Sequence, residues 1–251
     1  MSKSPKSRLD LLLVSRGLVA TRERARALIL AGEVTVNGTS VVKAGTAVDH
    51  EAVVELKQAD HPWVGRGGIK LDHALTIFHI DATGRRALDI GASTGGFTDV
   101  LLSRGAAHVV AIDVGENQLD WRLRTDPRVL CLERVNARYL TPAALPEEHR
   151  TFDIATVDVS FISLKHILPV VPRLLAPDGR LIVLVKPQFE AGRADVGTGG
   201  IVRDPAVHAR VVERVTTEAH QVGLVRLGLE PSPITGAEGN REFLMLLAHH
   251  D

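Results

Sequence analysis

Two kinds of hydrophobic pattern follow one another along the chain. From residue 8 to residue 57 the apolar positions come in short stretches, interrupted by Gly17, Gly32 and the Asn37-Gly38 pair. Apolar residues three and four positions apart predict helices, and valines that alternate around an Asn-Gly turn predict a hairpin. The predicted elements are two helices (8–18 and 21–32), a hairpin (33–42) and a strand (52–56). This first segment is therefore expected to be a small α+β unit.

From Gly65 onward, continuous apolar runs alternate with amphipathic stretches. The runs predict strands at 86–93, 108–115, 128–134, 152–160, 179–187, 224–231 and 241–249, and the amphipathic stretches predict helices at 69–78, 97–105, 117–125, 162–175 and 205–223. This alternation favours an α/β fold, with a parallel sheet covered on both faces. We predict two domains, 6–59 and 65–251, and a linker at 60–64 in which Pro62 bars helix continuation.

Charges cancel over the whole chain, which has 30 basic and 30 acidic residues, but not over its first 43 residues. Eight lysines and arginines face three acids there, a net charge of +5. A basic head on a neutral chain indicates a polyanionic partner, although an ordinary solvated surface gives the same composition. Arg22, Arg24 and Arg26 fan over the exposed side of the second predicted helix and are candidates for phosphate contact.

Several classes of protein are disfavoured by composition. The single cysteine, Cys131, allows no intrachain disulfide and fits a reducing cytoplasm. No stretch approaches about eighteen consecutive apolar residues, and residues 1–6 are polar, so we expect neither a membrane span nor an export signal. The eleven histidines are scattered, so we expect no metal site. A cytoplasmic protein is expected, and its oligomeric state is left open.

The stretch LDIGASTGGFT at 88–98 places a glycine-rich turn between a predicted strand and a predicted helix. Ser93 stands where the G-x-G-x-x-G turn of dinucleotide-binding proteins has the glycine that approaches a pyrophosphate. Asp89 precedes the turn, and a carboxylate suits a cationic ligand better than a phosphate. Asp113 ends the next strand and can accept hydrogen bonds from a ribose diol. This order favours S-adenosylmethionine; a tight turn needed only for helix packing is the alternative.

The candidate cofactor-binding residues extend from this turn to three later strand ends. They are Asp89, Gly91, Ala92, Ser93, Gly95, Gly96, Phe97, Asp113, Val114, Asn136 and Asp158. Asn136 is a candidate to border the adenine, and a local turn cap explains it equally well.

Four charged residues lie at or beside the expected carboxyl ends of strands, where open α/β sheets bind ligands. Asp158 and Lys186 each end a predicted strand, and Lys70 opens a helix after a Gly-Gly turn. Glu242 starts the final strand, which brings it to the same edge if that strand runs antiparallel. Desolvation and a neighbouring cation both disfavour the charged form of a lysine, so Lys186 is a candidate base. An ordinary ion pair is the alternative for each residue.

The first segment resembles the small RNA-binding module named after ribosomal protein S4. The likeness covers about fifty residues and rests on R-L-D-x-L-L-V-x-x-G-L followed by T-R-x-x-A-x-x-L-I-x-x-G-x-V-x-V-N-G. Such modules pack two helices against a short sheet and present basic residues to structured RNA. The resemblance, with the charge pattern, implies RNA contacts from Arg8, Arg16, Arg22, Arg24 and Arg26.

Nearly the whole chain, about residues 6 to 248, resembles the TlyA family of rRNA 2′-O-methyltransferases, whose members are often labelled hemolysins. The matching stretches are GRGGIKL, DIGASTGGFTDVLL, AIDVG, NAR, DVSFISL, VKPQFE and GNREF. Lys70, Asp158, Lys186 and Glu242 are similar in order and context to the Lys–Asp–Lys–Glu tetrad of FtsJ-type ribose methyltransferases. The resemblance implies a Rossmann-like methyltransferase sheet preceded by an S4-like domain.

The resemblance also implies a mechanism. Lys186, neutral at the moment of reaction, would take the proton of a ribose 2′-hydroxyl while Lys70 helps to orient that hydroxyl. Asp158 and Glu242 would hold the lysines, with Glu238 as the rival of Glu242. The family's targets imply ribosomal RNA within ribosomal subunits as the substrate. Because the chain stops soon after LMLLAHHD, we expect a cytidine of 23S rRNA, with 16S rRNA as an additional candidate.

Three other functions compete with this one. A non-catalytic RNA-binding ribosome-assembly factor would keep the cofactor fold but not need Lys186. A membrane-damaging hemolysin is disfavoured because no spanning stretch and no export signal is expected. A nicotinamide-dependent oxidoreductase is disfavoured by the glycine spacing and by Asp89. The glycine-rich segment 192–204 is predicted to be either a lid with glycine hinges or a disordered surface loop.

Overall fold

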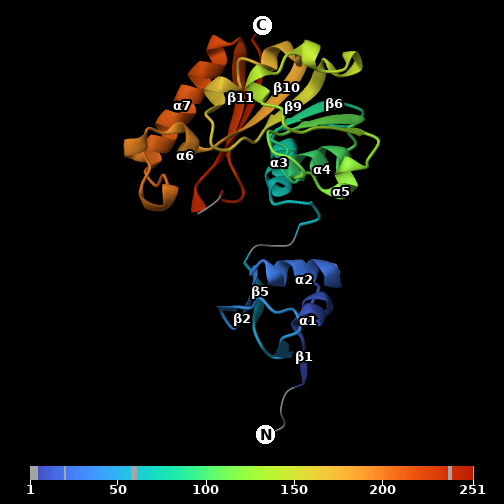
Figure 1. Ribbon diagram of the computed structural model, residues 1–251. Coiled ribbons are helices and arrows are strands. Elements are labelled where there is room, and N and C mark those ends of the chain that lie inside the picture. Colours follow the sequence, from blue (N-terminus) through green and yellow to red (C-terminus); the bar gives the residue numbers. More distant parts are fainter. Residues whose placement is uncertain (1–4, 20, 58–60, 237–238, 251) are drawn as a thin grey trace. The chain divides into compact units, whose positions relative to one another are not determined.

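The computed structural model describes residues 5–19, 21–57, 61–236 and 239–250 (Figure 1). The chain divides into two compact units, Met1–Pro62 and Trp63–Asp251. Trp63 and Val64, which the sequence predicts as linker, belong to the second unit. The Trp63 indole covers Gly68 so closely that a Cβ there would lie 2.3 Å from it. Residue 60 of the predicted linker lies outside the described residues.

The first unit holds two helices and two small antiparallel sheets. Its elements are β1 (Lys6–Arg8), α1 (Leu9–Ser15), α2 (Arg22–Leu30), β2 (Val34–Val36), β3 (Thr39–Ser40), β4 (Ala47–Asp49) and β5 (Val54–Leu56). β1 pairs with β4, and β2 lies between β3 and β5. The two predicted helices, the hairpin and the strand are confirmed. β1 and β4 escape prediction because three residues are too few to establish a hydrophobic period.

Local sequence explains the boundaries of these elements. Helix α2 begins after Thr21, whose hydroxyl accepts a hydrogen bond from Arg24 N at 3.2 Å. Ala25 and Ile29 point into the core and are fully buried. The β2–β3 hairpin turns at Asn37 and Gly38, with φ of +49° and +78°. Two positive φ values in a two-residue loop are typical of the hairpin turn that the Asn-Gly pair predicts.

The second unit is built on a seven-stranded sheet with helices on both faces. Its strands are β6 (Arg86–Ile90), β7 (His108–Ile112), β8 (Val129–Leu132), β9 (Phe152–Val157), β10 (Leu175–Val185), β11 (Leu224–Pro231) and β12 (Phe243–His249). Its α-helices are α3 (Gly67–Ile77), α4 (Gly96–Ser103), α5 (Trp121–Arg124), α6 (Pro187–Glu190) and α7 (Pro205–Gln221). Its 3₁₀ turns are η1 (Ala137–Tyr139), η2 (Pro142–Ala144), η3 (Glu147–His149), η4 (Leu164–His166), η5 (Val171–Arg173), η6 (Arg193–Asp195) and η7 (Thr198–Gly200).

The strand order is β11-β12-β10-β9-β6-β7-β8. The strands from β10 to β8 run parallel, and β12 runs antiparallel to both of its neighbours. The antiparallel last strand, on which the predicted position of Glu242 depends, is therefore confirmed. So is the Rossmann-like α/β class of the second unit.

Both faces of the sheet are buried, which accounts for the uninterrupted apolar run of β10. Val183 and Val185 belong to the hydrophobic cluster that includes α7, whereas Ile182 and Leu184 belong to the cluster that includes α3 and α4. Successive side chains of a strand point to opposite faces, so the two clusters lie on opposite sides of the sheet. Figure 1 shows α7 on one side of the strands and α3 and α4 on the other.

Two predicted helices of the second unit are wrong in extent. The segment 162–175 forms only the short turns η4 and η5, because Pro169 and Pro172 lack the N–H groups that a continuous helix needs. The segment 117–125 is helical only over α5, which starts after Asp120, whose side chain accepts from Arg122 N at 2.9 Å.

Within the described ranges, no helix is long and apolar enough to cross a membrane. The longest helix of those ranges, α7, has 17 residues and bears charged side chains along its exposed face.

Candidate active site

The four predicted catalytic residues meet at the carboxyl edge of the sheet in two ion pairs. The first pair joins Lys70, in the first turns of α3, to Glu242, which directly precedes β12. Lys70 Nζ lies 2.5 Å from Glu242 Oε2, and the side chains are only 10% and 2% exposed. Glu242 reaches this edge because Phe243 pairs with Val185, so the start of β12 lies beside the end of β10. Glu238, the rival candidate, lies outside the described residues.

The second pair joins the ends of two neighbouring parallel strands. Lys186 follows β10 and Asp158 follows β9, and Lys186 Nζ lies 2.5 Å from Asp158 Oδ1. The Lys186 ammonium also donates to Ser160 Oγ at 3.0 Å and lies 5.9 Å from the ring centre of Phe189. The two side chains are 9% and 18% exposed, so both remain within reach of a substrate. Ser160 is a site residue that the sequence interpretation missed, although it stands two positions after Asp158.

The glycine-rich turn brings the ends of β6 and β9 into contact. Gly91 has φ of +85°, and a Cβ at this position would lie 2.4 Å from the carbonyl oxygen of Asp158. Gly95 has φ of +98°, and a Cβ there would collide with the side chains of Leu119 and Leu123. Only glycine fits such positions without strain. These two glycines are thus explained by packing, and the argument for a ligand rests on the cavity beside them.

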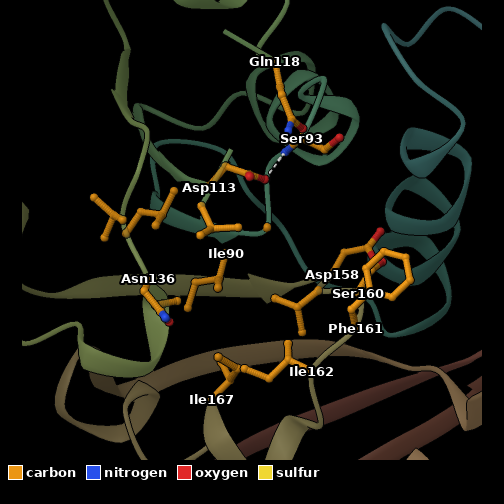
Figure 2. A pocket seen from close by; sticks show the side chains of 16 residues that line it. Ile90, Ser93, Asp113, Gln118, Asn136, Asp158, Ser160, Phe161, Ile162 and Ile167 are labelled. Carbon is orange, nitrogen blue, oxygen red and sulfur yellow. Dashed lines mark hydrogen bonds between the residues drawn. The ribbon is translucent and has the colours of Figure 1, made fainter. Parts of the chain in front are cut away.

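A cavity of about 440 Å³ opens between the turn and the ends of β7 and β9 (Figure 2). It is lined by Ile90, Gly91, Ser93, Ile112, Asp113, Val114, Gln118, Val135, Asn136, Ala137, Asp158, Val159, Ser160, Phe161, Ile162 and Ile167. Six predicted cofactor residues are among them: Gly91, Ser93, Asp113, Val114, Asn136 and Asp158. The sequence interpretation missed Gln118, Ser160, Phe161, Ile162 and Ile167, and the motif DVSFISL drew attention only through its aspartate.

A smaller adjoining cavity, of about 190 Å³, connects the turn to the second ion pair. Its lining includes Ala92, Gly96 and Phe97 together with Ser160 and Lys186. Asp158 and Ser93 line both cavities. The larger cavity therefore adjoins a space that reaches Lys186. Of the predicted cofactor residues, Asp89 and Gly95 line neither cavity.

Asp113 is held in place to accept from a ligand. Its Oδ2 accepts from Ser93 N at 2.8 Å and its Oδ1 from Gly115 N at 2.6 Å. A carboxylate offers about four lone-pair sites, so acceptor capacity remains for a diol. Figure 2 shows Asp113 at the wall of the cavity, with its bond to Ser93 drawn.

Asn136 caps a turn and also lines the larger cavity. Its side-chain oxygen accepts from Arg138 N at 3.1 Å and so caps the turn η1, while the residue lines the larger cavity. Figure 2 shows Asn136 at the opposite end of the cavity from Asp158, which matches a position beside a base rather than beside the reacting group.

Asp89 is fully buried instead of facing the cavity. Its oxygens accept from the hydroxyls of Thr98, at 2.7 Å, and Thr156, at 3.0 Å, which ties β6 to α4 and β9. Burial raises the pKa of Asp89 to about 6, and the two threonine hydrogen bonds oppose this shift. The carboxylate is thus a structural anchor for the turn that precedes the cavity.

The larger cavity fits an adenosyl group. Its volume falls in the range of small-molecule sites, and its walls of isoleucine and valine suit a flat base. Asp113 offers acceptors for a ribose diol, and the carboxylate of Asp158 lines both cavities beside Lys186. Among the described residues, no cluster of histidine, cysteine and acidic side chains could hold a metal ion.

The five arginines predicted to bind RNA have different environments in the first unit. Arg8 and Arg22 both donate to the fully buried Asp10, at 2.8 to 3.0 Å. These ion pairs hold the pKa of Asp10 far below its usual range; the hydrogen bond from Arg8 is the largest cause. Arg16 donates to the carbonyls of His50 and Ala52, and Arg24 contacts His61. Arg26 is exposed on α2.

Comparison with known proteins agrees with this architecture. Residues 63–249 match the model of the FtsJ-like methyltransferase family, and residues 7–54 match the S4 domain. The chain is 50% identical to YqxC of Bacillus subtilis, with 97% of this chain and 86% of the relative covered. It is 48% identical to the 16S/23S rRNA (cytidine-2′-O)-methyltransferase TlyA of Mycobacterium tuberculosis, with 96% and 90% covered.

A solved structure shares both units. A protein of Streptococcus thermophilus described as a hemolysin has a TM-score of 0.78 and 45% identity, with 98% of this chain and 90% of that chain covered. Because the family model spans most of the chain and the TlyA relative is covered almost completely, the chain belongs to the FtsJ-like methyltransferase family, in the TlyA group that carries an S4 domain.

Proposed function

We propose that the protein methylates the 2′-hydroxyl of a ribose in ribosomal RNA. S-adenosylmethionine, the donor of this family, supplies an electrophilic methyl group on a sulfonium. The observation that carries the proposal is the meeting of two lysine–carboxylate pairs at the edge where the adenosyl-sized cavity ends. The chain's own groups then have two tasks, which are to position a weak nucleophile in line and to remove its proton.

Lys186 is the proposed base. Once neutral, it accepts the proton of the 2′-hydroxyl as the new carbon–oxygen bond forms, and Asp158, 2.5 Å away, stabilises the ammonium that results. Ser160, which lies 3.0 Å from the same nitrogen, fixes the direction of the lysine side chain. Bound S-adenosylmethionine would supply the methyl group and would leave as the neutral thioether.

Lys70 is the proposed orienting cation. Its ammonium is fixed by the buried carboxylate of Glu242 at 2.5 Å, so its position costs no reorganisation during the reaction. A fixed positive charge beside the ribose favours the developing oxyanion. The pair thus contributes electrostatics without exchanging protons itself.

Two features support an RNA substrate. The S4 domain bears the basic head of the chain, and structured RNA is its proposed partner. In the second unit, Phe161 is 92% exposed at the cavity edge and 5.0 Å from the ring of Phe189. An exposed aromatic ring beside a ribose site is suited to stack on an unpaired base, and single-stranded bases are the usual targets of specific RNA recognition.

The relatives' names indicate the target more narrowly. TlyA of Mycobacterium tuberculosis is named for cytidines in 16S and 23S rRNA, and that of Campylobacter jejuni for a cytidine in 23S rRNA. Because 23S rRNA is common to both names, we propose a cytidine of 23S rRNA as the target, and 16S rRNA as a second target to be tested. Such a substrate implies action in the cytoplasm, where ribosomal subunits are present.

The test is transfer of labelled methyl groups to isolated 50S and 30S subunits from a strain that lacks the enzyme. We expect alkali-resistant label at one dinucleotide, lost in Lys186→Ala and kept in Lys165→Ala, a control at an exposed lysine. Binding of S-adenosylmethionine is measured for each variant to show that the cavity is intact. Cofactor binding without transfer to either subunit would contradict the proposal and favour a non-catalytic assembly factor.

A further inference from the structure

A separate cavity lies on the segments that precede α7 and β12. It has a volume of about 350 Å³ and is lined by Ile201, Val202, Arg203, His208, Gly239 and Arg241. None of these residues lines the cavities assigned above to the cofactor. Two of the six are arginines that come from distant parts of the sequence, which makes this cavity a candidate for an anionic ligand.

The two segments are held together by Asn240, which is only 3% exposed. Its side-chain oxygen accepts from Val202 N at 3.0 Å, and its side-chain nitrogen donates to Gly200 O at 3.0 Å. His208 forms the floor, because its Nε2 lies 2.9 Å from Val202 O and its ring meets Phe243 edge-on at 5.7 Å. The backbone on which the arginines stand is therefore fixed before any ligand arrives.

Among the described residues, no carboxylate neutralises the charge of the cavity. Within the described part of the chain, no ion pair is formed by Arg203 or Arg241, whereas the nearby Arg210 and Arg214 pair with acids. Asp204 adjoins Arg203 in sequence, but its Oδ1 accepts from Ala206 N and caps α7. Both cavity arginines are exposed, so their guanidinium groups are available to a partner from solution.

The cavity adjoins the proposed ribose site through Arg241. This residue directly precedes Glu242, the partner of Lys70, and both Arg241 and Glu242 line a further hollow of about 230 Å³. Figure 1 shows the segments before α7 (orange) and before β12 (red) at the same edge of the sheet as α6, which directly follows Lys186. Both arginines therefore stand on segments at the sheet edge where Lys186 and Glu242 lie.

We propose that this cavity binds a phosphodiester group of the RNA strand that carries the target ribose, with Arg203 and Arg241 as its donors. The inference rests on the proposed function. A guanidinium donates two parallel hydrogen bonds to phosphate oxygens, so two of them from rigid segments fix a phosphate in place as well as attract it. Backbone phosphate contacts of this kind set the register of a nucleic acid without reading its sequence.

The test compares Arg203→Gln, Arg241→Gln and the double variant with wild type. Arg173→Gln is the matched control, because Arg173 is an exposed arginine in η5, before the start of β10 and so at the opposite edge of the sheet. We measure the KM for ribosomal subunits, the kcat, the affinity for S-adenosylmethionine, and the salt dependence of subunit binding by filter retention.

Each single variant is expected to raise the KM about fivefold with little change in kcat or cofactor affinity. The slope of log binding constant against log salt should fall by about 0.7 for each arginine removed. Arg203→Lys and Arg241→Lys should have the wild-type slope, because lysine keeps the charge. Their KM should lie between those of wild type and the glutamine variants, because lysine loses the paired hydrogen bonds. Arg173→Gln should change none of these quantities.

Three outcomes separate this inference from the proposed function. Wild-type transfer of methyl groups, with an unchanged KM and slope in the double variant, would overturn the phosphate site and leave the function standing. Arginine-dependent binding of subunits without transfer would overturn the function and retain the site. A double variant that loses cofactor affinity and kcat together would show that the arginines support the fold, which also overturns the site.

Discussion

Lys186 Nζ and Asp158 Oδ1 lie 2.5 Å apart at the ends of two parallel strands that pair directly with each other. The pairing of β9 with β10 fixes this contact, because it brings the residues that follow Val157 and Val185 to the same edge. Asp158 also lies over Gly91 and lines both parts of the cofactor cavity. One carboxylate thus connects the proposed base to the proposed cofactor site.

From this pair we predict different defects for its two members. Lys186→Met should lower kcat by about 10³-fold and leave cofactor affinity within twofold, because the lysine acts only on the ribose proton. Asp158→Asn should lower both kcat and cofactor affinity, because the carboxylate serves both partners. Calorimetric titration with S-adenosylmethionine and single-turnover methyl transfer separate the two effects. Equal loss of cofactor affinity in both variants would contradict the division of roles.

The Lys70–Glu242 pair predicts a stability effect that can be separated from activity. Glu242→Gln leaves a lysine ammonium unpaired at 10% exposure, and breaking a buried ion pair costs about 3 kcal/mol. Lys70→Met combined with Glu242→Leu removes both charges and should recover most of that loss while transfer stays abolished. Urea denaturation followed by an activity assay checks both points. A double variant with wild-type activity would show that the pair is only structural.

The backbone at Gly91 leaves no room for a side chain. Gly91→Ala combines a φ of +85° with a Cβ only 2.4 Å from the Asp158 carbonyl, so it should displace the strand end and weaken cofactor binding at least tenfold. Gly84→Ala is the control, because its φ is +70° but no atom lies within 4 Å of its Cβ position. It should cost about 1 kcal/mol of stability and leave cofactor affinity unchanged.

The buried Asp89 predicts an unusual dependence of stability on pH. Its pKa rises from 3.8 to about 6 on folding, so the folded protein binds the proton more tightly than the unfolded chain does. The penalty for burying the charge is full above pH 6 and disappears as the pH falls toward 4. When the pH is lowered from 7.5 to 5, the free energy of unfolding of wild type should rise by about 1 kcal/mol relative to that of Asp89→Asn. Denaturant titrations of both proteins at both pH values measure this change. If the stabilities of wild type and Asp89→Asn change equally with pH, the prediction is wrong.

Two charged positions of the first unit predict different effects when they are replaced. Asp10→Ala should destabilise this unit, because it leaves Arg8 and Arg22 without their buried acceptor. Arg26→Gln should weaken subunit binding without altering thermal stability, because Arg26 is exposed and its loss removes charge alone. Thermal unfolding and filter binding, both measured on the full chain, check the two variants. Unchanged binding in Arg26→Gln would remove that residue from the proposed RNA surface.

The sequence allowed most of the fold to be predicted, and also the meeting of Lys70, Asp158, Lys186 and Glu242 at one edge of the sheet. Apolar periodicity is strong in β10 and α7, so those elements are recovered, whereas the Pro169-Pro172 stretch mimics a helix by its apolar content alone. Asp89 shows what the sequence could not predict about the site. Its place in the motif suggests a ligand, but only the structure shows that Thr98 and Thr156 occupy its oxygens.

The cavity-forming residues Ser160 and Phe161 were not predictable for a different reason. Their roles depend on the loop after β9, where Phe161 has φ of +63°, and no periodicity or charge pattern encodes that backbone. The basic cavity at Arg203 and Arg241 is equally hidden, because hydrogen bonds of Asn240, and not nearness in the sequence, bring the two segments together.

The most direct test of the central claim is the mass of the nucleosides released from ribosomal RNA after incubation of subunits with S-adenosylmethionine and the protein. The account predicts that 2′-O-methylcytidine appears with wild type and is absent with Lys186→Met at equal cofactor binding. Methylation on a base rather than on a ribose, or undiminished ribose methylation with Lys186→Met, would contradict it.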